Sequence, residues 1–147
     1  MLIRKAIQKH CRPGIKVKSS IIKVSGKKWV VVFEVWPSKR KPVRFKGSGT
    51  RQVVYIRYQD KTLQASREAE GILQLKFGNN AVSFSYGDME NKILKALDGR
   101  RQASLEELKM LTGIVEPMLS HKLIHLAAAN VIGWKPLDRA DIFLSVV

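Results

Sequence analysis

The spacing of hydrophobic and polar positions changes once along the chain, near Gly87. Before Gly87, apolar residues come in short runs separated by turn-forming residues, which is typical of β-strands. The clearest run is 28–36, which lies between a Ser-Gly-Lys turn and Pro37. After Gly87, apolar residues recur every three or four positions, as in helices. We therefore expect an α+β protein with a β-rich domain over 1–86 and a largely helical domain over 87–147.

The first part of the chain predicts one helix and several strands. Residues 1–12 are expected to form a short basic helix that ends at Pro13-Gly14. A strand is expected from Ile15 to Val24. The run 28–36 is apolar on both faces at its centre, which predicts a central strand covered on each side. Aromatic residues of these strands are accordingly expected in the core: Trp29, Phe33 and Tyr55.

The rest of the β-rich part alternates between loop, strand and helix patterns. Residues 37–50 are basic and rich in Gly and Pro, as in a loop. Strand composition returns at 52–58. Residues 62–70 have the charge pattern of a short helix that stops at Gly71, and 72–77 with 81–86 alternate like a hairpin.

The helical spacing after Gly87 predicts three helices and a closing pair of strands. The first helix carries the stripe Met89, Ile93, Leu94 and Leu97 and stops at Asp98-Gly99, and Ser104 has the position of an N-cap for the second. The expected remainder is a turn at Thr112-Gly113, a third helix from about Val115 to Asn130, and one or two strands over 134–147.

Within 105–132, several residues occur at spacings typical of a helix-turn-helix. They are Gly113, Pro117, the run Ser120-His121-Lys122-Leu123, Leu126, Ala129 and Val131-Ile132. This segment resembles the winged-helix repressors of the ArsR and MarR type, and the resemblance covers the chain from Asp88 onward. It implies a winged helix, a homodimer, and Ser120, His121 and Lys122 facing a DNA groove.

The segment departs from that family where bases would be recognised. Val115 replaces the usual Ser or Thr N-cap, Glu116 brings a negative charge, and Met118 replaces a small polar residue. Residues 88–147 also carry eight bases and eight acids, so this part is electrically neutral. The alternative is that the winged helix mediates protein–protein contacts in a larger nucleoprotein assembly.

Charge is concentrated at the other end of the chain. Residues 1–60 hold sixteen Lys and Arg but two acids, Glu34 and Asp60, a net charge of +14, whereas the remaining 87 residues have a net charge of +1. Such a field attracts polyanions. The densest part is the loop after Pro37, and its bases are the candidate phosphate contacts: Lys39, Arg40, Lys41, Arg44, Lys46 and Arg51. The nearby aromatic residues Trp36, Phe45, Tyr55 and Tyr58 could stack on unpaired bases.

Other chemistry has less support in the sequence. No Ser-His-Asp or Cys-His set is present, so we expect no catalytic residues, no cofactor and no metal site. His121 and His125 lie on one helical face but lack a third ligand. Cys11 is the only cysteine, which predicts a reducing compartment, cytoplasmic or nucleoid-associated. No apolar run is long enough for a membrane span.

The expected function is therefore non-catalytic nucleic-acid binding, with duplex DNA favoured over RNA, in a regulatory or architectural role such as transcription regulation. Three alternatives remain. The first is the assembly module described above, and the second is RNA binding. The third is a Mg²⁺-dependent nuclease built on Glu34, with Lys28 and Asp60 in reach.

Overall fold

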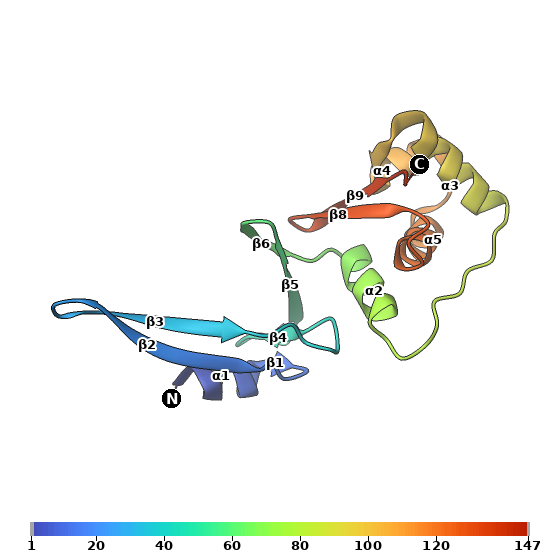
Figure 1. Ribbon diagram of the computed structural model, residues 1–147. Coiled ribbons are helices and arrows are strands. Elements are labelled where there is room, and N and C mark those ends of the chain that lie inside the picture. Colours follow the sequence, from blue (N-terminus) through green and yellow to red (C-terminus); the bar gives the residue numbers. More distant parts are fainter. Residues whose placement is uncertain (1, 147) are drawn as a thin grey trace.

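The computed structural model describes residues 2–146 and confirms an α+β architecture with five helices and short antiparallel strands in this range (Figure 1). The helices are α1 (Leu2–His10), α2 (Arg67–Lys76), α3 (Asp88–Arg100), α4 (Leu105–Thr112) and α5 (Glu116–Ala128). The strands are β1 (Cys11–Arg12), β2 (Val17–Ser25), β3 (Lys28–Val35), β4 (Arg44–Lys46), β5 (Gln52–Tyr58), β6 (Lys61–Gln64), β7 (Gln102–Ser104), β8 (Gly133–Leu137) and β9 (Ala140–Leu144).

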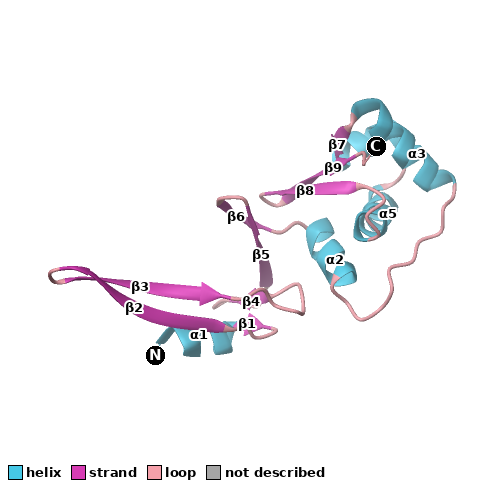
Figure 2. Ribbon diagram, viewed as in Figure 1, coloured by secondary structure: helices cyan, strands magenta, loops and turns pink. Residues whose placement is uncertain are grey.

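The N-terminal half consists of a small sheet and a projecting ribbon. The sheet has the strand order β1-β4-β5-β6. The ribbon is the hairpin β2–β3, which extends away from the rest of the molecule (Figures 1 and 2). Its register pairs Val17 with Val35 and Ile21 with Val31. β2 and β3 form a two-stranded sheet of their own, and most of their side chains are exposed.

The prediction that 28–36 forms a covered central strand is wrong. β3 has β2 as its one neighbour in the described part of the chain. Trp29 is 61% exposed and Tyr55 of β5 is 54% exposed, and Phe33 is also exposed, so the expected aromatic core is not formed. β3 is apolar, as the sequence predicts, but the sequence does not show whether an apolar strand is covered by its own chain.

The region around Gly71 also differs from expectation. The predicted helix at 62–70 is confirmed over 67–70, but its bounds are wrong, because β6 occupies 61–64 and α2 continues through Gly71 to Lys76. The predicted hairpin at 72–86 is wrong, because α2 covers its first part and 77–87 has no regular structure. Ser66 is the N-cap of α2, and its side chain accepts a hydrogen bond from the Ala69 N–H at 2.9 Å. Ala69 and Ile72 are fully buried, so tertiary packing selects the helix.

The C-terminal half is close to its predicted element order. Ser104 caps α4 and forms a capping box with Glu107, and Gly113 ends α4 at a φ of 68°. α5 and the two closing strands are confirmed within a few residues, and the strand β7 is an addition that pairs with β9 in the order β7-β9-β8.

One hydrophobic core extends across the predicted boundary at residues 86 and 87. Its buried members come from α2 and from the elements after it: Ile72, Ile93, Leu97, Ala103, Leu108, Ile114, Leu119, Leu123, Leu126, Ala127, Ile132 and Phe143. A second, smaller cluster holds Val54, Ala65 and Ala69, and Trp134 packs against both clusters. The N–H of Arg139 also donates to the carbonyl of Gln64 at 2.9 Å, which ties the β8–β9 turn to β6. α2 therefore packs with the C-terminal helices.

Candidate nucleic-acid interface

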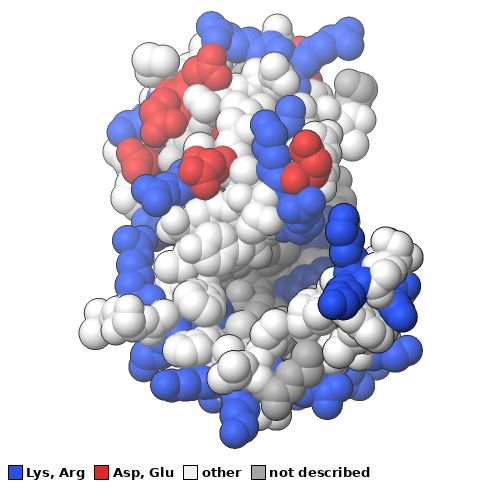
Figure 3. All heavy atoms as spheres, turned by 90° about the vertical axis from the view of Figure 1, so that its left-hand side faces the viewer, with Lys and Arg blue, Asp and Glu red and all other residues white. Residues whose placement is uncertain are grey.

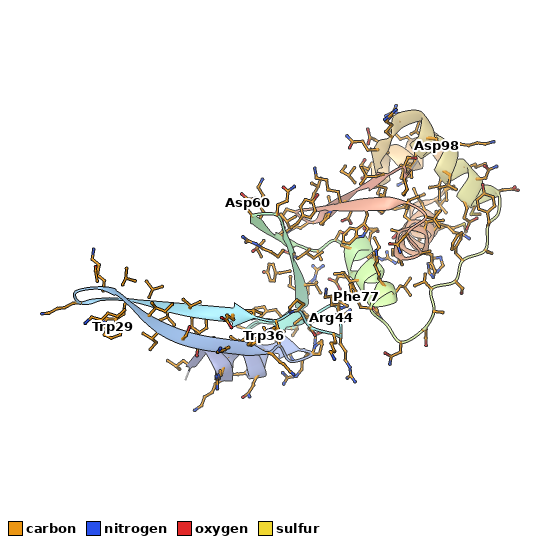
Figure 4. The ribbon with its side chains drawn as sticks, viewed as in Figure 1. Trp29, Trp36, Arg44, Asp60, Phe77 and Asp98 are labelled. Carbon is orange, nitrogen blue, oxygen red and sulfur yellow. The ribbon has the colours of Figure 1, made fainter. Side chains whose placement is uncertain are left out.

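An open hollow of about 700 Å³ lies at the base of the ribbon. Its lining residues are Pro13, Gly14, Lys16, Trp36, Pro37, Ser38, Lys39 and Arg40, and we call it the Trp36 hollow. Trp36 is 47% exposed and Lys16, Lys39 and Arg40 are exposed. Figure 4 shows Trp36 where the ribbon meets the rest of the N-terminal half. The hollow thus combines one aromatic face with three cations.

Local hydrogen bonds hold this arrangement. The Trp36 N–H donates to the Lys16 carbonyl at 3.2 Å, so the two chain segments that enter and leave the ribbon are joined there. The Ser38 hydroxyl donates to the Arg40 carbonyl at 2.8 Å and accepts from the Arg40 N–H at 3.3 Å. These bonds shape the loop so that Lys39 and Arg40 stay beside Trp36. An indole ring flanked by cations is suited to a stacked base with its phosphate nearby.

The other four predicted phosphate contacts divide into two pairs. Lys46 and Arg51 are exposed. Lys41 instead has its Nζ 4.2 Å from the centroid of the Phe77 ring, and Arg44 forms an ion pair with Glu70 at 3.7 Å. Figure 4 places Arg44 and Phe77 beside α2. Lys41 and Arg44 thus help to attach the basic loop to α2, and Lys39, Arg40, Lys46 and Arg51 are the bases with free surface.

The three residues predicted on α5 do not form a common exposed surface. The expected outward orientation of Ser120 is wrong, because the residue is 2% exposed and its hydroxyl donates to Glu68 at 2.5 Å. Lys122 forms an ion pair with the buried Glu90 at 2.5 Å. This contact with the ammonium lowers the pKa of Glu90 below its ordinary value. His121 alone of the three is exposed.

Neighbouring segments flank α5 on two sides. α2 lies along one side, where Ile124 of α5 meets the backbone of Gly71 and Lys76 bonds to Asn130 at 2.5 Å. Residues 83–85 lie along another side, where they share a small hollow of about 170 Å³ with His121, Lys122 and His125. The sequence analysis does not predict either contact with α5. Both contacts come from residues 62–86, whose secondary structure is predicted wrongly. The α5 surface left for contact with a base is therefore small.

Further cations lie outside the predicted set. They include residues of α1, of the ribbon and, just before β2, Lys16: Arg4, Lys5, Lys9, Lys16, Lys18, Lys23, Lys27 and Lys28, all exposed. Figure 3 views the molecule from the ribbon side; Lys and Arg surround its lower part, and Asp and Glu gather in the upper part. The cations therefore surround the N-terminal half on several sides and are not confined to one face. The charge count of residues 1–60 includes them, but their placement depends on the projection of the ribbon.

A buried carboxyl group, Asp141, lies away from this surface, where α2 meets β9. The Oδ2 atom of this side chain accepts a hydrogen bond from the Ser66 hydroxyl, and its Oδ1 atom has no hydrogen-bond partner among residues 2–146. The pKa of Asp141 is raised to about 7, mainly by burial and also by the nearby Glu68 charge, although the hydrogen bond from the Ser66 hydroxyl opposes this rise. Across residues 2–146, no group of three or more His, Cys, Asp or Glu side chains is placed to hold a metal ion.

Comparison of the chain with family models, with curated proteins and with solved structures gives no match. Within residues 2–146, no helix is both long enough and apolar enough to cross a membrane.

Proposed function

We propose that this protein binds nucleic acid through its N-terminal half, in a non-catalytic regulatory or architectural role, with duplex DNA as the ligand. One observation carries the proposal. Of the sixteen Lys and Arg in residues 1–60, Arg44 is the one with an ion pair in the described part of the chain. The other cations repel one another, and a polyanion that binds them releases its condensed counterions.

The salt dependence of binding tests this proposal directly. Four phosphate contacts, at Lys39, Arg40, Lys46 and Arg51, would give a slope of log K against log salt of about −4 on duplex DNA. We expect the double variant Lys39→Glu/Arg40→Glu to weaken binding about tenfold or more and to make the slope shallower by about 2. A slope near zero for the unaltered protein would sink the proposal.

A matched control separates local contacts from net charge. Lys92 and Lys95 on α3 are exposed, and the variant Lys92→Glu/Lys95→Glu carries the same change in charge. We expect this variant to lose much less affinity than the variant of the basic loop. Equal losses would mean that overall charge, and not the loop beside Trp36, determines binding.

We propose that the C-terminal half is a winged helix that binds another protein. The element order from α3 to β9, with the sheet β7-β9-β8, supports the winged-helix assignment. The cover over α5 favours the alternative in which this half contacts protein. Exposed apolar side chains at the α4–α5 turn, Met110, Val115 and Met118, support that role. We expect His121→Ala to leave the affinity for duplex DNA unchanged. A tenfold loss of this affinity would indicate that α5 contacts DNA.

A second candidate ligand is single-stranded RNA, which the Trp36 hollow favours. A partly exposed indole among three cations suits an unpaired base better than a duplex, whose bases are already stacked. Competition between duplex DNA and single-stranded RNA at one fixed salt concentration decides between the two. If RNA at an equal nucleotide concentration displaces the bound duplex, RNA is the preferred ligand. If the duplex stays bound, DNA is the preferred ligand.

A further inference from the structure

The outer edge of β3 is unpaired in the described part of the chain, and it is long and apolar. β3 has β2 on one side and no strand on the other. Its central residues Trp29, Val30, Val31 and Phe33 are all exposed. An open edge of this kind is a template for another strand, and a soluble chain normally protects it. A strand that pairs with this edge would cover it.

The hydrogen-bond ladder determines which groups this edge presents. The Trp36 N–H donates to the Lys16 carbonyl, and the register joins Val17 to Val35 and Ile21 to Val31. Because N–H and C=O groups alternate in direction along a strand, even-numbered residues of β3 bond to β2. The N–H and C=O groups of Trp29, Val31 and Phe33 therefore point outward, to the open edge.

The order of side chains along β3 is self-complementary. From Lys28 to Glu34 the sequence is base, aromatic, three valines, aromatic, acid. Two such strands in antiparallel order, centred on Val31, place Lys28 opposite Glu34 and Trp29 opposite Phe33. Opposite charges and aromatic pairs directly across an antiparallel ladder are favourable.

We propose that β3 pairs antiparallel with β3 of a second copy of this chain, across a two-fold axis at Val31. The pairing gives a four-stranded sheet in the order β2-β3-β3-β2, with the outward groups of Trp29, Val31 and Phe33 bonded across the axis. Glu34 is one of two acids in residues 1–60, and this register places it opposite a lysine of the other copy. This contact lies on the ribbon, not on the winged helix.

Any other register loses this complementarity. A shift by two residues in either direction removes the opposition of Lys28 and Glu34 and of Trp29 and Phe33, and a shift by one turns the side chains of the two strands to opposite faces. The pairing also leaves Trp29, Val31 and Phe33 on the same face as Ile21 of β2, so the apolar side chains of both copies form one continuous face.

Mixing of two charge variants tests the register. In Lys28→Glu, both pairs across the axis become acid against acid, and in Glu34→Lys both become base against base. We expect each variant alone to raise the dimer dissociation constant about tenfold relative to the unaltered protein in sedimentation equilibrium without nucleic acid. An equimolar mixture of the two should regain dimer, because each pair across the axis then joins a carboxylate of one variant with an ammonium of the other.

Two controls keep the outcome interpretable. Lys16→Glu makes the same change in charge just outside β2 and should leave the dimer intact. In a Cys11→Ser background, Val31→Cys should be cross-linked by a short bifunctional maleimide, and Ile21→Cys, on the same face but on β2, should not. An unaltered protein that stays monomeric at all concentrations, or variants that fail to recover on mixing, overturns the proposal. Because no nucleic acid is present, either result is independent of the proposed function.

Discussion

Gly71 of α2 lies so close to Ile124 of α5 that a Cβ atom at position 71 would fall 2.8 Å from the Ile124 Cδ1 atom. This close approach lets α2 pack along α5, and it explains why a glycine stands inside a helix. A larger side chain here must move Ile124 or separate the two helices. A substitution at Gly71 therefore tests whether α2 packs against α5.

We expect Gly71→Leu to destabilise the protein by about 2 kcal/mol, because the added atoms overpack the α2–α5 contact. Gly99→Ala is the control, since a Cβ atom at Gly99 of α3 would meet no described atom within 4 Å beyond its chain neighbours and the adjacent backbone of its own helix. Alanine there should stabilise the helix by about 0.5–1 kcal/mol. Urea unfolding measures both, and equal effects of the two variants would contradict the packing described.

The Lys122–Glu90 pair predicts a stability effect without a binding effect. Lys122→Ala leaves the buried Glu90 carboxylate without its cation, at a cost of about 2 kcal/mol in unfolding free energy. Lys92→Ala, an exposed lysine without an ion pair in the described chain, should change stability by less than about 0.5 kcal/mol. Thermal unfolding and duplex titration of both variants check this. Weaker binding by a stable Lys122→Ala protein would assign Lys122 to the interface.

The buried Asp141 predicts that the protein is more stable in mild acid than at neutral pH. Its pKa is raised to about 7 in the folded protein, against 3.8 ordinarily, so the folded state holds a proton that the unfolded chain has released above pH 4. The unfolding free energy should therefore fall between about pH 4 and 7, by about 2 kcal/mol from pH 5 to pH 8. Asp141→Asn should flatten this part of the profile relative to the unaltered protein, and parallel profiles would rule out Asp141 as the cause.

Trp36 separates the two candidate ligands. We expect Trp36→Ala to weaken binding of single-stranded RNA about tenfold or more, because base–aromatic stacking contributes about 1–3 kcal/mol per base. Trp36→Phe should retain most of the affinity, and duplex binding should change little with either variant. Fluorescence anisotropy of labelled single-stranded RNA and duplex DNA measures the affinity of the unaltered protein and of both variants. Equal loss on both ligands would indicate a structural role for the indole at the base of the ribbon.

Local signals explain which parts of the fold were predictable. The cap at Ser104, the turn at Gly113 and the regular apolar spacing of α5 act within a few residues, so the C-terminal elements follow from short segments. The segment 62–86 was mispredicted because Ile72 to Phe77 fits both strand and helix spacing. The contact of Gly71 with Ile124 and the burial of Ile72 favour the helix.

The candidate site divides in the same way. The sequence located the bases of the loop after Pro37, because a charge count needs no structure. It did not find that Lys41 and Arg44 are engaged by Phe77 and Glu70, or that Ser120 and Lys122 are engaged by Glu68 and Glu90. These partners lie far away along the chain, so spacing alone does not show them.

By itself, the amino-acid sequence determined the α+β class, the strong positive charge of the first sixty residues and the local caps and turns of the C-terminal helices. Each of these depends on composition or on neighbours a few residues apart. Tertiary structure decided that β3 is an open edge, that α2 flanks α5 and that Trp36 lies among three cations. These features depend on which surfaces meet after the chain folds, and the free energy of such contacts is shared between residues far apart in the sequence.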